Sequence, residues 1–154
     1  MLGSGVLLWA RHYGRPGRRR ASGLLFVAIL MHNFEEGIAY PATRPEATHL
    51  LRQIWPALQL PPPAVFQGAL LLLTIVVGAM LSWAAMTRDN RGGWLVVRVT
   101  ASVLLANVMV PHIPAAILLG GYAPGVVTAV ALNLPLGLWI LCDGASRRRS
   151  ADRY

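Results

Sequence analysis

The chain has 154 residues, of which 55% are hydrophobic and 13% are charged. Soluble domains carry about 25% charged residues, so this composition predicts a small membrane protein with one domain. The net charge is +8, all fourteen basic residues are arginines, and most of them lie at the edges of apolar runs, where they act as topology signals. That placement argues against nucleic-acid binding, and the single cysteine, Cys142, excludes an intramolecular disulfide framework.

Four apolar runs predict membrane-spanning helices, since a bilayer needs about 17–25 mostly apolar residues. They cover residues 21–40, 64–86, 94–119 and 125–142. Basic segments at 1–20 and 144–154 are predicted cytoplasmic tails on either side of a membrane domain at 21–143. The predicted fold is therefore all-α, a four-helix transmembrane bundle. Pro111 and Pro114 predict a kink near the end of the third run.

The connection between the first two runs, residues 41–63, is long for a helical bundle. Within it, residues 49–55 carry apolar side chains at helical spacing and end on Trp55, a residue type that collects at membrane interfaces. We expect a short interfacial helix that lies on the membrane surface or covers the bundle as a lid.

The arginines predict how the chain is oriented. Cytoplasmic loops carry an excess of basic residues. With the N-terminus inside, Arg44 and Arg52 face the outer side, and Arg98 lies one turn inside the third run, from where it can reach the inner surface. The other eleven arginines fall on the inner side. The prediction is a multi-pass plasma-membrane protein with both termini in the cytoplasm.

The first run contains His-Asn-Phe-Glu-Glu at residues 32–36. A charge at the bilayer centre costs roughly 2.5–3.5 kcal/mol on insertion scales, so these side chains need polar partners. His32, Glu35 and Glu36 have the spacing i, i+3, i+4 and therefore project from one side of a helix. An ionisable cluster within a membrane helix indicates a functional site.

Other polar residues are predicted to lie at the same depth as this motif. In the four-span topology, at 1.5 Å per residue, they fall between the bilayer midplane and the outer surface. They are Gln67, Thr74, Asn107, His112, Thr128 and Asn133. A shared pocket that opens to the outer side explains this distribution better than scattered tolerance of polar residues.

Two histidines and a carboxylate on facing helices suit a divalent metal, zinc or iron, with a coordination position left for water. We expect His32, His112 and one of Glu35 and Glu36 to bind the metal, while the other glutamate acts as general base; Glu36 is our choice of ligand. Hydrogen bonds that orient these ligands would come from Asn107, Tyr122, Thr128 and Asn133. The simpler alternatives are interhelical hydrogen bonds for the two asparagines and a tight turn for Tyr122.

Three ordered features resemble the HXXEE family of small bacterial membrane proteins. They are the His32–Glu36 motif, the later histidine His112, and Tyr122-Ala-Pro-Gly125, which matches a YxPG motif. The resemblance covers residues 23 to about 142. It implies where the functional site lies and does not imply a reaction.

The leading hypothesis is a metal-dependent membrane enzyme that hydrolyses a lipid or another membrane-embedded substrate. Two alternatives use the same residues. One is a carrier or channel for a metal ion or protons, which with four helices per chain would need a homodimer to form a wide enough path. The other is a non-catalytic partner of another membrane protein, in which the polar cluster only locks helix packing.

Overall fold

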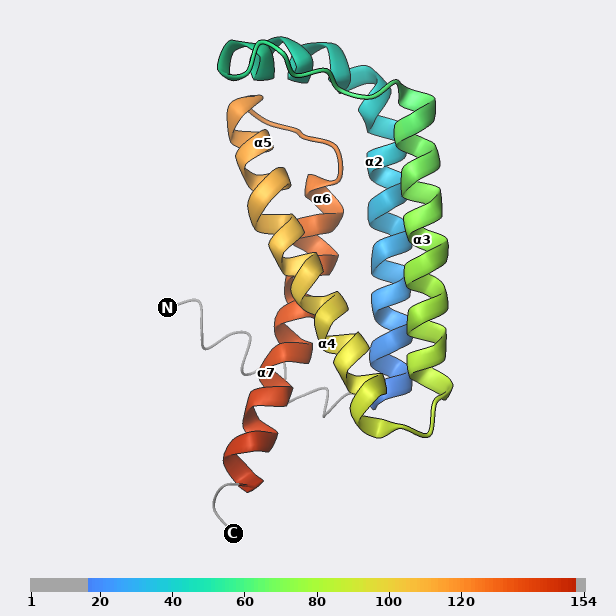
Figure 1. Cartoon of the computed structure of the whole chain (residues 1–154). Helices are drawn as coiled ribbons and strands as arrows, with labels where there is room; N and C mark the ends of the chain where they lie inside the picture. The colour runs from blue at the N-terminus through green and yellow to red at the C-terminus, as the bar shows by residue number, and fades with distance from the viewer. Residues whose placement is uncertain (1–16, 152–154) are drawn as a thin grey trace.

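The computed structural model describes residues 17–151, and within that range it contains helices and no strand (Figure 1). The first helix begins at Arg18, so most of the predicted N-terminal tail, residues 1–16, lies outside the described residues. At the other end the backbone stays helical to Ala151, and residues 152–154 lie outside the description. The predicted all-α class is confirmed for the described residues.

The helices join into four long rods (Figure 1). The first two rods are single helices, and each of the last two contains a π-helical turn, labelled η. The bounds are α2 Arg18–Ile54, α3 Pro63–Met86, α4 Asn90–Asn107, η1 Val108–His112, α5 Ile113–Leu118, α6 Val126–Thr128, η2 Ala129–Asn133 and α7 Leu134–Ala151. The helix α2 contacts α3, α4, α6, η2 and α7.

The helix α2 continues through the stretch that we expected to be a separate surface helix. Its later part turns away and lies across the end of the bundle, above α5 (Figure 1). Pro41 and Pro45 lie within α2, and a proline within a helix removes a hydrogen bond to the carbonyl four residues earlier. For Pro41 that carbonyl belongs to Gly37, and Gln67 of α3 donates to it from 2.8 Å. The neighbouring helix thus satisfies the carbonyl that the proline frees.

Polar contacts also hold the segment that returns from α2 to α3. The hydroxyl of Tyr40 and the Nε of Arg44 both donate to the carbonyl of Pro61, at 2.8 and 2.9 Å. The rings of Tyr40 and Phe66 stack with their centroids 3.9 Å apart. Arg44, interpreted from the sequence as a topology signal, therefore also fixes this connection.

The predicted kink in the third run takes the form of the π-turn η1, which includes Pro111. A second π-turn, η2, lies two residues before Pro135 in the last rod. In a π-turn the backbone hydrogen bonds join residues five apart, and such turns occur often at functional sites. Both turns begin directly after a polar residue, Asn107 in one case and Thr128 in the other.

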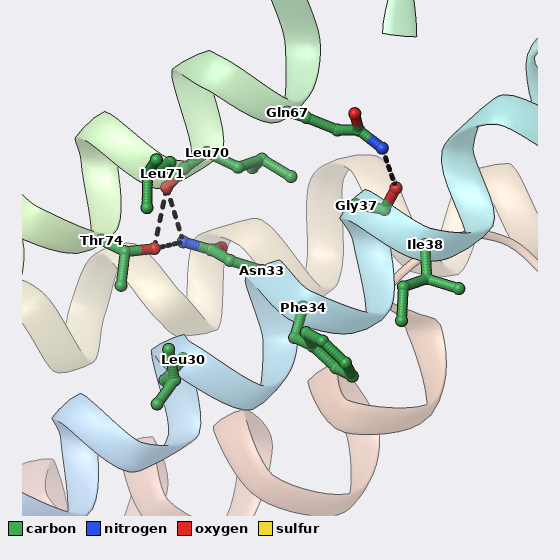
Figure 2. Close-up of a pocket in the computed structure, with 9 residues that line it drawn as sticks. All are labelled: Leu30, Asn33, Phe34, Gly37, Ile38, Gln67, Leu70, Leu71 and Thr74. Carbon is green, nitrogen blue, oxygen red and sulfur yellow. Dashed lines mark hydrogen bonds between the residues drawn. The ribbon is translucent and has the colours of Figure 1, made fainter. Parts of the chain in front are cut away.

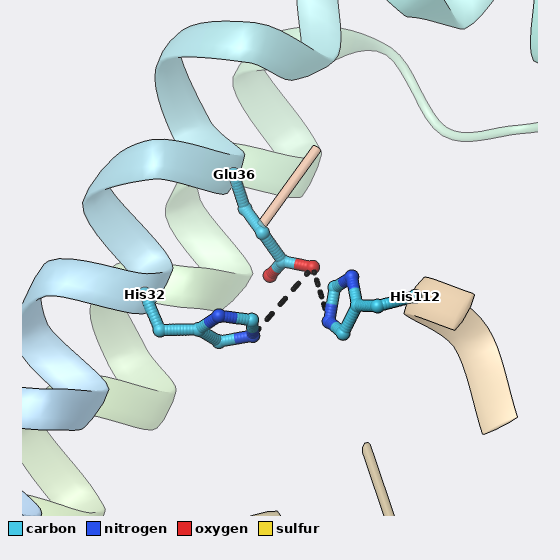
Figure 3. A group of neighbouring side chains, drawn as sticks. All are labelled: His32, Glu36 and His112. Atoms are coloured by element: carbon cyan, nitrogen blue, oxygen red, sulfur yellow. Dashed lines mark ion pairs between the residues drawn. The ribbon is translucent and has the colours of Figure 1, made fainter. Parts of the chain in front are cut away.

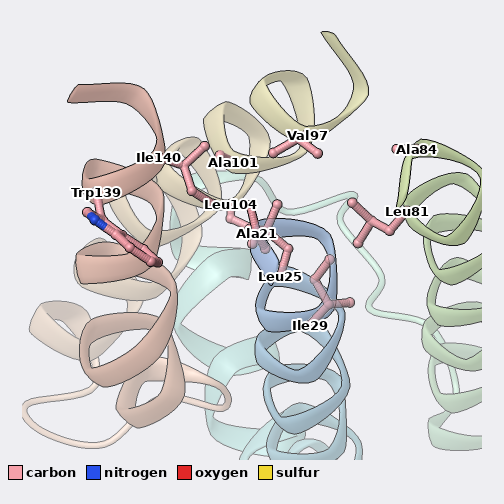
Figure 4. Close-up of a cluster of buried hydrophobic side chains, with 10 residues drawn as sticks. All are labelled: Ala21, Leu25, Ile29, Leu81, Ala84, Val97, Ala101, Leu104, Trp139 and Ile140. Carbon is pink, nitrogen blue, oxygen red and sulfur yellow. The ribbon is translucent and has the colours of Figure 1, made fainter. Parts of the chain in front are cut away.

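The buried apolar core lies where the rods meet (Figure 4), and its α3 members Leu81 and Ala84 lie close to the end of that helix at Met86. Its residues come from α2, α3, α4 and α7. They are Ala21, Leu25, Ile29, Leu81, Ala84, Val97, Ala101, Leu104, Trp139 and Ile140. Arg18 closes this end of the bundle, because its guanidinium donates to the carbonyls of Thr87 and Asp89 after the end of α3.

Among the residues that the structure describes, two stretches are long and apolar enough to cross a membrane, Pro63–Met86 and Asn90–Leu118, and Val126–Cys142 is a shorter apolar helix. Only 6% of the most apolar window of α3 is buried. A core helix of a soluble protein would be mostly buried, so the exposed apolar surface of α3 favours contact with lipid. In α2 the His-Asn-Phe-Glu-Glu motif lowers the hydropathy of the run.

Candidate metal centre

Three potential metal ligands from two helical rods meet inside the bundle (Figure 3). His32 and Glu36 lie on α2, and His112 ends the π-turn η1. The Oε1 atom of Glu36 lies 3.4 Å from Nε2 of His112 and 4.0 Å from Nε2 of His32. One ligand atom from each residue lies within 4.8 Å of the others. Both histidines are almost completely buried.

The local helix geometry explains why these side chains converge. On α2, His32 and Glu36 have the i, i+4 spacing that places side chains on one face. On the other rod, η1 separates Asn107 from His112 by five residues, the spacing that a π-turn brings together. The side-chain amide of Asn107 then reaches the Nε2 atoms of both His32 and His112, at 2.9 and 3.0 Å.

The hydrogen bonds made by the Nδ1 atoms of His32 and His112 fix the tautomers of the two rings. Nδ1 of His112 lies 2.8 Å from the carbonyl oxygen of Pro124, which can only accept, so Nδ1 carries the proton and donates. Nδ1 of His32 lies 3.1 Å from the Thr128 hydroxyl, which itself donates to Glu35 at 2.6 Å. Nδ1 of His32 is therefore a donor as well. In the neutral ring of each histidine, Nε2 then carries the lone pair.

Two imidazole lone pairs and the carboxylate of Glu36 therefore point into the same small space. Three electron-pair donors that face one another favour a positive charge between them, and the Asn107 amide supplies only neutral N–H donors to the two imidazoles. A divalent cation supplies that charge, and imidazole nitrogen with carboxylate oxygen is a donor set used for zinc and for iron. Histidine ligands whose outer N–H is held by a carbonyl or hydroxyl are typical of metal sites.

Glu35 faces a different set of partners from Glu36. Its carboxylate accepts hydrogen bonds from the Tyr122 hydroxyl, the Val127 and Thr128 amides and the Thr128 hydroxyl, at 2.6–3.2 Å. These amides belong to the second and third residues of α6, within the first turn of the last rod, where a carboxylate is favourable. Glu35 therefore anchors the turn before α6 and, through Thr128, orients His32.

Tyr122 completes this anchor from the turn itself. Burial and the hydrogen bond to Glu35 raise the pKa of Tyr122 to about 12. Its hydroxyl therefore keeps its proton and remains a donor to the carboxylate at neutral pH. The predicted tight turn is present, and in addition its tyrosine contacts the His/Glu motif.

Gly125 forms one wall of the candidate site. Its backbone has φ +78°, in the left-handed region that favours glycine. A Cβ atom at this position would lie 2.6 Å from Cγ of Glu36 and 2.8 Å from Cε1 of both His32 and His112. The sequence indicated a turn here and gave no sign that the glycine touches all three candidate ligands.

A family comparison matches the same region. Residues 23–140 match the model of a family described as "Protein of unknown function with HXXEE motif". The chain belongs to the HXXEE family. It is also similar to the Bacillus subtilis (strain 168) protein "Uncharacterized protein YrkK", at 23% identity over 115 residues that cover 74% of this chain and 68% of that protein. No solved structure matches the chain.

Not every residue of this HXXEE chain that we expected to hydrogen-bond to the candidate ligands does so. Asn107, Thr128 and Tyr122 make the hydrogen bonds given above. Asn133 ends η2 and is completely buried, yet neither of its side-chain polar atoms has a hydrogen-bond partner within the described residues. The suggested interhelical hydrogen bond of Asn133 is therefore not seen, whereas Asn107 does connect two rods.

A groove of about 240 Å³ lies between α2 and α3 and does not include the three candidate ligands (Figure 2). Its polar side chains are Asn33, Gln67 and Thr74. Asn33 donates to the Thr74 hydroxyl at 2.7 Å and Gln67 donates to Gly37, so both amides already join the two helices. Gln67 and Thr74, expected near the common pocket, serve helix packing here.

Proposed function

We propose that this HXXEE protein is a metal-dependent membrane enzyme that hydrolyses a lipid or another membrane-embedded substrate. The observation that carries the proposal is the convergence of two imidazole lone pairs and the Glu36 carboxylate inside an apolar bundle. The Asn107 amide donates to both imidazoles but carries no net charge, so the Glu36 carboxylate beside them gains no positive partner from it.

In the proposed mechanism, His32, His112 and Glu36 hold one zinc or iron ion. Such an ion, when bound, would supply a water that is nucleophilic at neutral pH, because it would lower the pKa of that water to about 7. Glu35 is assigned a positioning role in place of the general-base role expected from the sequence, because four hydrogen-bond donors already occupy its carboxylate. Through Thr128 it keeps His32 in the tautomer that presents Nε2 to the metal.

We further propose that four rods cross the plasma membrane, with both termini inside. The exposed apolar side chains of α3 and the apolar helix Val126–Cys142 support this arrangement. Cysteines introduced at the exposed positions Glu46 and Arg88, in a Cys142→Ser background, test it. In intact spheroplasts a membrane-impermeant maleimide should label Glu46→Cys, and should label Arg88→Cys only after permeabilisation. Labelling of both sites without permeabilisation would contradict the topology.

The catalytic part of the proposal is tested with metal-loaded protein in mixed micelles of ester-linked phospholipids. We expect released fatty acid or headgroup, detected by mass spectrometry. His112→Ala should lower the rate by more than about 100-fold. The loss of a residue that only hydrogen-bonds to a metal ligand costs about 10–100-fold, and the loss of a ligand itself should cost more. His49→Ala is the matched control, since His49 is exposed and contacts Gln53 on the surface segment. No product from metal-loaded protein with any phospholipid class would reject the phospholipid hydrolase.

One observation favours the transport alternative. Hydrogen bonds link buried His32 through Thr128 and Glu35 to Tyr122, whose side chain is 46% exposed. Such chains can relay protons. Proton or zinc uptake into liposomes that depends on His32 and Glu36, without hydrolysis, would support a carrier or channel.

A further inference from the structure

We propose that Asn107 is a fourth metal ligand whose side-chain amide changes partner when the metal binds; this inference rests on the proposed metal site. The relevant contact is unusual. One amide nitrogen, Nδ2 of Asn107, lies 2.9 Å from Nε2 of His32 and 3.0 Å from Nε2 of His112. These are the two ring nitrogens that would bind the metal.

The tautomers make this contact a pair of donated hydrogen bonds. Both Nδ1 atoms donate outward, to Pro124 and to Thr128, so both Nε2 atoms accept. The amide group of asparagine has two N–H donors, one for each ring. Asn107 thus holds the two imidazoles with their lone pairs turned towards a common point, and the rings stand at 88° with centroids 4.6 Å apart.

A metal ion and the two N–H groups of the Asn107 amide compete for the same Nε2 lone pairs. Each neutral imidazole has one lone pair at Nε2, and a lone pair that binds zinc at about 2.0–2.1 Å cannot also accept an N–H. Metal binding therefore requires both N–H donors to leave. A half-turn about the Cβ–Cγ bond of Asn107 exchanges Nδ2 for Oδ1, and this turns a competing donor into an oxygen that can coordinate the metal.

The backbone around Asn107 favours this dual role. The residue ends α4, and the π-turn η1 that follows brings it onto the same side as His112. Asn107 is half-buried, which leaves its amide room that a completely packed side chain lacks. The resulting donor set has two nitrogens and two oxygens, with Glu36 Oε1 and Asn107 Oδ1 as the oxygens. More oxygen in the set favours harder divalent ions such as Fe²⁺ or Mn²⁺.

The test is titration of the detergent-purified full chain with Co²⁺, whose visible absorption reports its coordination. Asn107→Asp removes the two competing donors and adds a negative ligand, so we expect affinity to rise at least about tenfold. Asn107→Ala removes the oxygen ligand, so we expect a fall of about 10–100-fold and an altered spectrum. Asn33→Ala is the matched control, because Asn33 is adjacent to His32 and donates to Thr74 on α3.

Each outcome separates this inference from the proposed function. If Asn107→Ala binds Co²⁺ as tightly as the wild type or more tightly, Asn107 only competes with the metal and the inference is wrong, while the metal site stands. If Asn107→Asp does not bind more tightly, the inference also fails. If the wild type binds no Co²⁺, the metal site itself is rejected. A gain in affinity for Asn107→Asp cannot arise from misfolding.

Discussion

Replacing Gly125 by alanine is expected to weaken metal binding strongly. The added methyl group would lie 2.6–2.8 Å from atoms of Glu36, His112 and His32, so all three candidate ligands would have to move. Overpacking of this kind costs about 1–3 kcal/mol, and a side chain at φ +78° adds about 1–2 kcal/mol of backbone strain. We expect metal affinity to fall by more than about 100-fold, which exceeds the usual effect of replacing a residue that only hydrogen-bonds to a metal ligand.

Gly120→Ala is the control for backbone strain. Gly120 has φ +65°, and a Cβ at this position would meet nothing within 4 Å. This variant should lose about 1–2 kcal/mol of stability and keep its metal affinity. Competition titration with a chromophoric zinc chelator measures the affinity, and chemical denaturation in detergent measures the stability. Equal metal affinity in Gly125→Ala and the wild type would show that the turn does not form a wall of the metal site.

The adjacent glutamates should respond differently to the same substitution. Glu36→Gln removes the carboxylate that lies 3.4 Å from Nε2 of His112 and is expected to reduce metal affinity by more than about 100-fold. Glu35→Gln weakens hydrogen bonds to Tyr122, Val127 and Thr128, so its main effect should be on stability, about 1.5–3 kcal/mol. Its metal affinity should fall by at most about 10–100-fold, through the altered orientation of His32.

Each of these variants is the control for the other, because both change a carboxylate to an amide of the same size at neighbouring positions. Metal content and unfolding should be measured on the same preparations. A greater loss of metal in Glu35→Gln than in Glu36→Gln would reverse our assignment of ligand and positioning residue. Equal losses would mean that both carboxylates bind the metal.

The sequence was sufficient to predict that His32, Glu36 and His112 meet. The i, i+4 spacing placed two of them on one helix face, and the predicted topology brought His112 to the same depth. It could not separate Glu35 from Glu36, because both lie on the same side of an ideal helix. The difference comes from α6, whose amides and hydroxyl bind Glu35.

Backbone groups account for most of what the sequence did not reveal. The carbonyl of Pro124 fixes the tautomer of His112, and Gly125 packs on the ligands through its backbone. Neither effect follows from side-chain type. The continuous helix α2 was also missed, because Pro41 normally ends or kinks a helix. Its freed carbonyl is satisfied by Gln67, a long-range contact that local rules cannot predict.

The central claim is that His32, Glu36 and His112 bind one divalent metal ion. Elemental analysis of detergent-purified wild-type protein beside His32→Ala and His112→Ala tests it most directly. We predict about one zinc or iron per chain in the wild type and loss of that metal in both variants. Well-folded wild-type protein that holds no metal, even after reconstitution with zinc and with iron, would contradict the claim.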